Sequence, residues 1–305
     1  MDRGRPCLRM DDACTRNGNG GDVRGDYGGG DDDYAGGTTA GACGGGIPRI
    51  VHKVWFDLGN GPRPPARFDA MYRTLLRHHP GWTVLTWDEA AAERLLRERY
   101  AWFLPTWRAY RDPVYRVDAI RLFALHAHGG VYVDQDIEHL RSMAPMLAGP
   151  DPRRRPRRNV LVRSRNWRRG VSNFAMACER GSRFFTHAVR RLPAAARLPW
   201  NVRGTCLGTM YVAGPGFLQR CVRRYDRPWE VTVLGERAFQ VPDRALPGGG
   251  GFDDAYGVHA YCASWGFSRK LLADVMRGLV AVMLLALAAL AVAAALRRPS
   301  RRCAR

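Results

Sequence analysis

The feature that most restricts the fold of this chain is a helix that ends at two glycines and leads at once into an acidic strand end. Residues 112–128 begin with an Asp-Pro pair, which is typical of the N-cap and first position of a helix. Apolar residues recur at helical spacing from Val117 to Ala127, and Gly129 follows the last of them, where helices often end. Residues 129–136 read GGVYVDQD, which predicts a short strand with two carboxylates where it ends.

The two carboxylates, Asp134 and Asp136, are separated by one residue. Acids at this spacing are common in proteins, and the simplest interpretation is a solvated strand end. The alternative is a site for a hard divalent cation, because such ions prefer carboxylate oxygens, and a cation there would neutralise a diphosphate. Asp118 and Arg121 lie three residues apart on the preceding helix and therefore neighbour each other, either as an ordinary ion pair or as a pair that binds hydroxyl groups.

The combination of Asp118-x-x-Arg121 with the run 129–136 resembles the core of the glycosyltransferases with a DXD sugar-binding region, glycosyltransferase family 32. This family includes initiating α-1,6-mannosyltransferases and inositol-phosphoceramide mannosyltransferases. The chain is also similar, more distantly, to the clostridial toxin glucosyltransferases. The resemblance implies an α/β fold, namely a GT-A-type, Rossmann-like domain that binds a nucleotide sugar.

Three further segments resemble this family in the same order along the chain. Residues 47–55 match its opening strand, and Asn173 matches its central Asn segment. Residues 259–265 match its closing pattern of a His followed by Ser-Trp. The resemblance covers about residues 47 to 267 and identifies the family, though not the substrate.

The resemblance also implies roles for individual residues. Asp136 is expected to bind the metal, Mn²⁺ or Mg²⁺, with support from Asp134, while His259 closes over the ion from a C-terminal loop. The catalytic residues are expected to be Asp118, Arg121, Asp134 and Asp136. The donor is expected to be held by Trp55, Asp118, Arg121, Tyr132, Asp134, Asn173, Ser264 and Trp265. Trp55 is expected to stack on the nucleotide base, and the alternative is that it is a core aromatic. The alternative for His259 is an ordinary surface or core histidine.

The segments before this core alternate between strand-like and helix-like patterns. Residues 50–56 and 82–87 read as strands, and residues 68–79 and 88–100 read as helices. Such alternation predicts an α/β fold with a mainly parallel sheet and helices on both faces. Ligands of these sheets bind at the carboxyl ends of the strands, where the acidic pair is expected.

Composition divides the chain into segments. Residues 1–46 are rich in Gly and Asp and have almost no apolar periodicity, so a disordered low-complexity tail is expected. The catalytic domain is expected at 47–267. The segments after it are a juxtamembrane linker at 268–278, a transmembrane helix at 279–296 and a basic tail at 297–305.

Residues 279–296 are 18 consecutive apolar residues without a charge. At 1.5 Å per residue they are just long enough to cross a hydrocarbon core of about 30 Å. The alternative is a buried core helix of a soluble protein, but few soluble helices are apolar on every face. The arginines that follow favour a cytosolic tail with the catalytic domain in a lumen, whereas the lack of an N-terminal signal sequence favours tail insertion with the domain in the cytosol. A single-pass protein of an ER/Golgi-type endomembrane is expected, with both orientations open.

The formal net charge is +20, and only Lys53 and Lys270 among the basic residues are lysines. Such a charge suggests nucleic acid or an anionic membrane surface as a partner, although the Arg-, Ala- and Gly-rich composition weakens this argument. The Arg-rich run at 153–158 has no recognition helix, RNA-binding motif or zinc site beside it, so no nucleic acid is expected. The run is either a solvated loop or a patch for anionic lipid head groups.

Four cysteines lie in the part of the chain that is expected to fold, at positions 178, 206, 221 and 262. In a lumen they would form two disulfides in one of three pairings, and otherwise they are buried free thiols. The eight cysteines of the chain show no Cys-x-x-Cys pair and no metal-like spacing.

Together with these patterns, the family resemblance implies a metal-dependent, retaining glycosyltransferase. The expected donor is GDP-mannose, with a UDP-hexose as the close competitor, and the expected acceptor is a hydroxyl of a glycan or glycolipid. The competing hypothesis is a catalytically inactive, membrane-tethered protein that binds anionic lipid or nucleic acid through its Arg-rich patch.

Overall fold

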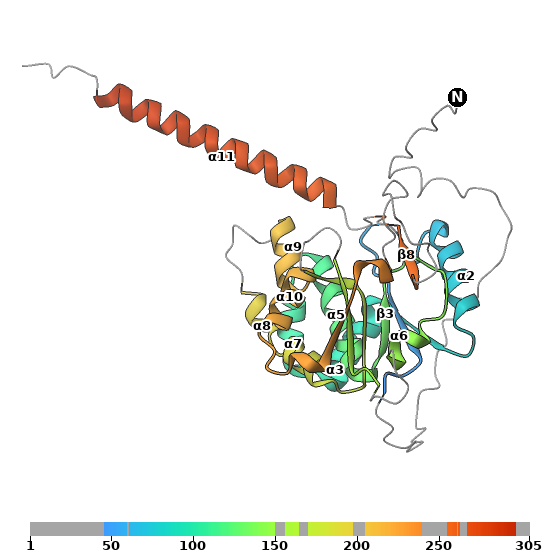
Figure 1. Cartoon of the computed structure of the whole chain (residues 1–305). Helices are drawn as coiled ribbons and strands as arrows, with labels where there is room; N and C mark the ends of the chain where they lie inside the picture. Colours follow the sequence, from blue (N-terminus) through green and yellow to red (C-terminus); the bar gives the residue numbers. More distant parts are fainter. Residues whose placement is uncertain are drawn as a thin grey trace, which may run out of the picture.

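The computed structural model describes residues 46–59, 61–149, 156–164, 170–197, 205–239, 255–260, 262 and 267–296. These residues form an α/β body from which one long C-terminal helix, α11 (Phe267–Leu296), extends away (Figure 1). The expected basic tail at 297–305 and nearly all of the expected disordered tail at 1–46 lie outside the described residues.

The main sheet has six strands in the order β2-β1-β3-β6-β5-β7. They are β1 (Ile50–Val54), β2 (Thr83–Trp87), β3 (Gly130–Val133), β5 (Asn159–Arg163), β6 (Val171–Cys178) and β7 (Val231–Leu234). β1 pairs in parallel with β2 and β3, and β5 pairs in parallel with β7. β6 is antiparallel to both β3 and β5, so it alone of these six strands runs in the opposite direction. The predicted α/β fold with a mainly parallel sheet is confirmed.

Two helices of the first half, α3 (Glu89–Arg99) and α5 (Pro113–His128), begin where their capping residues predict. The side chain of Asp88 accepts a hydrogen bond from the N–H of Ala91 and caps α3, and Asp112 accepts one from the N–H of Val114 and caps α5. The α-helices of the body are α2 (Asp69–His78), α3 (Glu89–Arg99), α4 (Leu104–Ala109), α5 (Pro113–His128), α6 (Ala144–Ala148), α7 (Arg183–Val189), α8 (Leu192–Ala195), α9 (Cys206–Val212) and α10 (Pro215–Arg223). Short 3-10 turns lie at Ala66–Phe68, Ala101–Phe103, Pro228–Glu230 and Glu236–Ala238.

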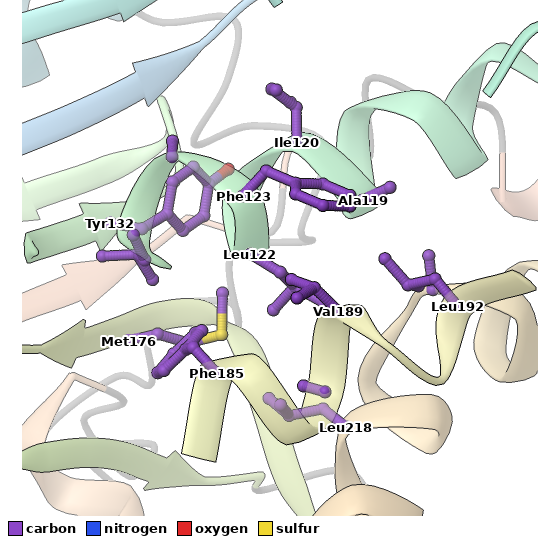
Figure 2. Close-up of a cluster of buried hydrophobic side chains, with 14 of the residues drawn as sticks. Ala119, Ile120, Leu122, Phe123, Tyr132, Met176, Phe185, Val189, Leu192 and Leu218 are labelled. Atoms are coloured by element: carbon purple, nitrogen blue, oxygen red, sulfur yellow. The ribbon is translucent and has the colours of Figure 1, made fainter. Parts of the chain in front are cut away.

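Helix α5 is the centre of the larger hydrophobic core. Its buried side chains meet others from β3, β6, α7, α8 and α10 (Figure 2). The members labelled there are Ala119, Ile120, Leu122, Phe123, Tyr132, Met176, Phe185, Val189, Leu192 and Leu218. The sequence predicted one buried face for this helix, but neighbours pack against it on several sides. A helix fixed in this way holds its polar residues, Asp118 and Arg121, in place.

The turn from α5 into β3 depends on its two glycines. Gly129 and Gly130 have φ values of +69° and +97°, which residues with a side chain rarely adopt. Trp87 Nε1 donates to His52 Nδ1 (3.0 Å), so the other ring nitrogen of His52 carries the proton that is donated to the carbonyl of Gly129 (2.7 Å). Burial lowers the pKa of His52 to about 4, which keeps this ring neutral at physiological pH.

A substitution at Gly130 tests this turn. A Cβ at Gly130 would lie 2.5 Å from the carbonyl oxygen of Ile50, whereas nothing lies within 4 Å of a Cβ at Gly181, where φ is +68°. We expect Gly130→Ala to lower the free energy of unfolding by at least about 2 kcal/mol, because backbone strain and a main-chain clash add, and Gly181→Ala to lower it by only about 1 kcal/mol. Urea unfolding of both variants measures the difference, and equal losses would contradict the clash.

Helix α11 contains an apolar segment, Leu272–Ala293, that is long enough to cross a membrane. Its mean hydropathy is 2.4 and none of it is buried against the rest of the protein. The expected span at 279–296 lies in this helix, and the residues of the expected linker at 268–278 form its first turns. The helix starts early because these residues contain no proline, and their one glycine, Gly278, is tolerated.

Candidate functional site

The acidic pair follows β3 at its carboxyl end, as predicted. The N–H of Asp134 donates to the carbonyl of Phe174 on β6 (2.8 Å). Lys53 on β1 donates through Nζ to the carbonyl of Asp134 (2.9 Å). The backbone of Asp134 is therefore held by the strands on either side of β3.

A short C-terminal strand completes the site. β4 (Ile137–His139) follows Asp136 directly and pairs antiparallel with β8 (Gly257–His259), with Ile137 opposite His259. The residues after β8 therefore pass beside Asp136. The N–H of Ala260 donates to the Asp136 carbonyl (2.9 Å), and the N–H of Cys262 donates to Asp136 Oδ2 (2.9 Å).

The three residues predicted as metal ligands lie together. His259 Nε2 is 3.2 Å from Asp136 Oδ1 and 3.9 Å from Asp134 Oδ2, and the imidazole ring stacks on Phe174 with centroids 4.6 Å apart. One ligand atom of each of the three residues lies within 4.8 Å of the other two. Two carboxylate oxygens and an imidazole nitrogen suit a divalent ion such as Mn²⁺, so the donor set fits the expected metal.

The other predicted polar residues form one buried network around Arg121. Arg121 Nη1 lies 3.3 Å from Asp118 Oδ1 and 3.2 Å from Asp134 Oδ1, and it donates to the carbonyl of Asn173 (3.3 Å). Its guanidinium lies over the ring of Tyr132, 4.8 Å from the centroid, and the Tyr132 hydroxyl donates to Asp134 Oδ1. Asn173 Nδ2 donates to Asp118 Oδ1 (3.0 Å). The Asp118–Arg121 pair is thus an ion pair that also contacts the DXD motif.

The surroundings of Asp118 and Asp136 shift the pKa values of these two acids in opposite directions. Burial raises the pKa of Asp118 to about 6, although the charge of Arg121 opposes this shift. Burial also acts to raise the pKa of Asp136, but the hydrogen bond and charge of His259 and the N–H of Cys262 outweigh it, and the net pKa is lowered. Asp136 is therefore ionised at neutral pH, which is the form that binds a metal.

One predicted donor-binding residue, Trp55, lies outside this network, and two others fall outside the described residues. Trp55 is 8% exposed, donates through Nε1 to the carbonyl of Gly61 (3.0 Å) and packs edge-on against Phe68, so its place here agrees with the core-aromatic alternative. Its contact with a nucleotide base stays a prediction. Ser264 and Trp265 lie outside the described residues, and their roles also stay predictions.

Two site residues were not singled out from the sequence. Phe174 provides the stacking surface for His259, and Lys53 holds the backbone of the DXD motif. Burial lowers the pKa of Lys53 to about 8, while the charges of Asp134 and Asp136 oppose this shift. A signal for Lys53 existed, because a lysine inside a strand is unusual in a chain whose basic residues are nearly all arginines.

The cysteines of the folded region do not pair among themselves. Cys178, Cys206 and Cys221 are free thiols, and Cys262 is disulfide-bonded. The alternative of two disulfides among these four residues is therefore wrong. The alternative of buried free thiols holds for Cys178 and Cys221, whereas Cys206 is only partly buried.

The α/β domain gathers two carboxylates, an imidazole and a buried arginine at the carboxyl end of β3, as the resemblance to the DXD-type glycosyltransferases implies. Residues 65–152 match the family described as the glycosyltransferase sugar-binding region containing the DXD motif. This match includes the Asp118–Arg121 pair and the acidic pair, and it confirms the predicted resemblance.

Individual proteins show the same likeness. The chain is 29% identical to inositol phosphoceramide mannosyltransferase 3 of Schizosaccharomyces pombe over 172 residues, which are 56% of this chain and 44% of that protein. It is 30% identical to mannosyl phosphorylinositol ceramide synthase SUR1 of Saccharomyces cerevisiae over 191 residues, 62% of this chain and 45% of that protein. The chain thus spans less than half the length of these relatives. The solved structure of PaToxG glycosyltransferase is similar with a TM-score of 0.42 and 13% identity, over 59% of this chain and 70% of that one.

Proposed function

We propose that this chain is a metal-dependent, retaining glycosyltransferase that moves mannose from GDP-mannose to a hydroxyl of a glycan or glycolipid. The observation that carries the proposal is the convergence of Asp134, Asp136 and His259 at the carboxyl end of β3, beside the buried Arg121. The choice of mannose follows the names of the relatives described above, which are mannosyltransferases or mannosyl-transferring synthases of inositol phosphoceramide. A UDP-hexose is the second candidate donor.

The described residues divide the chemical work in the following way. Asp134, Asp136 and His259 would hold Mn²⁺ or Mg²⁺, and the bound ion neutralises the negative charge that builds on the leaving diphosphate. Arg121 supplies a second positive charge close to Asp134, fixed by its contacts with Asp118 and Tyr132. A charge fixed before the reaction costs no reorganisation when the transition state forms.

The contacts that Asp118 and Asp136 already make within the protein support the retaining stereochemistry. Asp118 is bound to Arg121 and Asn173, and Asp136 is bound to His259. These acids are poorly placed to act as a free general base for the acceptor. In a retaining transfer on one face of the sugar, the departing phosphate oxygen takes the acceptor proton, and no protein base is needed.

We also propose that α11 anchors the enzyme in an ER/Golgi-type endomembrane, through the segment Leu272–Ala293. In this arrangement the catalytic body stays close to the bilayer surface, where a glycolipid acceptor would be found.

The described part of the Arg-rich run argues against the competing function. Arg157 donates through Nη1 to the carbonyl of Met146 (2.8 Å), and Arg158 forms ion pairs with Glu179 and Glu230. These two arginines are therefore occupied by the protein itself. They do not form a free basic surface for anionic lipid or nucleic acid.

A donor panel tests the proposal. The full chain in detergent micelles is heated with Mn²⁺ and either GDP-mannose, UDP-glucose or UDP-galactose. We expect GDP-mannose to raise the melting temperature, because a ligand at 100 times its Kd stabilises the folded state by about 2.7 kcal/mol, and EDTA to remove the rise. No rise with any donor, together with salt-sensitive binding to anionic vesicles or oligonucleotides, would favour the inactive binding protein instead.

A further inference from the structure

Helix α11 contacts the catalytic body through a carboxylate near its start. Asp274 Oδ2 accepts a hydrogen bond from the N–H of Cys206, the first residue of α9 (2.8 Å), and Oδ1 accepts one from Arg277. The side chain of Asp274 is 23% exposed, whereas the apolar residues on either side of it, Leu272 and Val275, are more than half exposed. The first N–H groups of a helix have no partner inside that helix, and Asp274 provides one of them with an acceptor. This bond holds the start of α9 against α11.

The outward face of α9 is apolar. Leu207, Met210 and Tyr211 stand at the spacing i, i+3 and i+4, so they share one face of the helix, and the buried residues of α9 lie on the other. Leu207 is 55% exposed, while Met210 and Tyr211 are partly buried.

A cation lies at the edge of this face. The guanidinium of Arg220 on α10 lies over the ring of Tyr211, 4.9 Å from the centroid, and Arg220 Nη2 donates to the Tyr211 carbonyl (2.7 Å). Tyrosine rings and the long stems of arginines are typical of the boundary between a membrane and water, because each combines an apolar body with a polar end.

Helix α11 places the outward face of α9 at the boundary of a bilayer. When the uncharged run 279–296 spans the hydrocarbon core of about 30 Å, Asp274 lies about 7.5 Å before that core along the helix axis. The polar head-group region adds roughly 5–7 Å on each side of the core. Asp274, and with it the start of α9, therefore lies at the level of the head groups.

The arrangement of the body agrees with this placement. In Figure 1, α11 runs away from the body on the side where α9 lies, whereas α2 lies on the opposite side. An exposed leucine is ordinary by itself, and Leu76 on α2 is 48% exposed. Leu207 differs from Leu76 because the residue before it is hydrogen-bonded to α11.

We propose that the outward face of α9, formed by Leu207, Met210 and Tyr211, is a membrane-contacting surface that lies in the head-group layer of the bilayer. Its partner is the lipid surface, with Leu207 toward the acyl chains and Tyr211 and Arg220 among the head groups. The inference rests on the proposed anchoring by α11 and adds a second contact with the membrane. Two contacts fix the orientation of the catalytic body, whereas a single helix would let it turn above the bilayer.

The same helix borders the candidate site. Gly214 follows the end of α9, and a Cβ there would lie 3.3 Å from Asp118 Oδ2. A contact that fixes α9 on the bilayer therefore also fixes how far the network of Arg121 lies from the head groups.

The fluorescence of one added tryptophan tests the contact. The full chain with Leu207→Trp is reconstituted in phosphatidylcholine vesicles that are either plain or brominated near the head-group end of the acyl chains. Bromine quenches tryptophan only at close contact. The wild type, with its nine tryptophans and none in α11, is measured in the same way and subtracted. We expect the added tryptophan to lose most of its emission in the brominated vesicles.

The matched control is Leu76→Trp. It is the same substitution at a leucine of similar exposure, but on the side of the body away from α11. We expect its added emission to stay nearly unchanged in the brominated vesicles, and both variants to melt close to the wild type because both positions are exposed. No quenching at position 207, or equal quenching at positions 207 and 76, would overturn the inference.

Two substitutions at Asp274 test the bond to α9 in the Leu207→Trp background. Asp274→Ala removes the carboxylate and keeps a good helix former, so quenching at position 207 should fall toward the level of the control. Asp274→Asn keeps an oxygen that accepts from the N–H of Cys206 and should retain the quenching. Unchanged quenching in Asp274→Ala would contradict the role of this bond.

Failure of the anchoring itself looks different. The full chain would then separate from the vesicles when they are floated through a density gradient at alkaline pH, which would overturn the anchoring and the inference together. A chain that floats with the vesicles but shows no quenching at position 207 overturns the inference alone. Neither measurement depends on glycosyl transfer, so a failure of the proposed activity is seen separately in the donor panel.

Discussion

Asp136→Asn is expected to lower kcat/KM for donor turnover by about 10³-fold and to remove the Mn²⁺-dependent rise in melting temperature with GDP-mannose. The substitution takes away the charge of a proposed metal ligand, and a metal ion contributes several kcal/mol of charge stabilisation in the transition state. The amide oxygen of Asn still accepts the hydrogen bond that the N–H of Cys262 donates to Asp136. The fold should therefore survive, and the ligand-free melting temperature should stay close to that of the wild type.

The control for this prediction is the same substitution at a capping residue. Asp88 caps α3 through the N–H of Ala91, and Asn is as good an N-cap as Asp, so Asp88→Asn should change neither turnover nor stability by much. Donor hydrolysis rates and thermal shifts with and without Mn²⁺ are measured for both variants. A variant Asp136→Asn that keeps a metal-dependent shift and near-normal turnover would show that the ion is held elsewhere.

Arg121→Met is expected to lower the free energy of unfolding by about 3–5 kcal/mol at pH 7, because it leaves buried acids without their counter-charge. The side chains of Arg121 and Asp118 are only 11% and 7% exposed, and the same guanidinium also pairs with Asp134. The matched control is Arg108→Met, which breaks an exposed ion pair with Glu93 and should cost less than about 1 kcal/mol. Arg121→Lys keeps the positive charge, so its free energy of unfolding should fall by less than that of Arg121→Met.

The loss in free energy of unfolding that Arg121→Met causes should depend on pH in a defined direction. The pKa of Asp118 is raised from 3.8 to about 6 in the folded protein, so protonated Asp118 favours folding below pH 4, and this contribution disappears as the pH rises through 6. Without Arg121, the ionised form of Asp118 is even less favourable in the folded protein. The deficit of Arg121→Met relative to the wild type should therefore be smallest near pH 4 and largest above pH 6, as measured by urea unfolding across this range. A deficit that is constant with pH would mean that the lost interaction is packing on Tyr132 and not charge.

The parts of the site that were predictable from the sequence lie within one local segment. The cap at Asp112, the periodicity of α5 and the pair Gly129–Gly130 are short-range signals, and they place Asp134 at the end of β3 without knowledge of the rest of the fold. The opposite direction of β6 was not predictable in the same way, because strand direction depends on long-range pairing that no local pattern encodes.

The remaining parts of the site depend on contacts across the domain. His259 was expected only from the family resemblance, since β8 has three residues and is too short to recognise from its pattern. Lys53 was missed because a polar residue in an apolar segment does not reveal whether its polar atom will be paired, open or exposed. The residues of the expected juxtamembrane linker at 268–278 continue into the apolar segment as one helix, because charged residues do not stop a helix.

The pairing of β4 with β8 has a consequence for biosynthesis. His259, the imidazole of the proposed metal site, lies on β8, the last strand among the described residues, whereas both carboxylates come from the middle of the body. A nascent chain therefore has the two acids in place well before the ribosome delivers His259, and a contact so distant in sequence forms late. The proposed metal site would therefore be complete only once translation has passed β8.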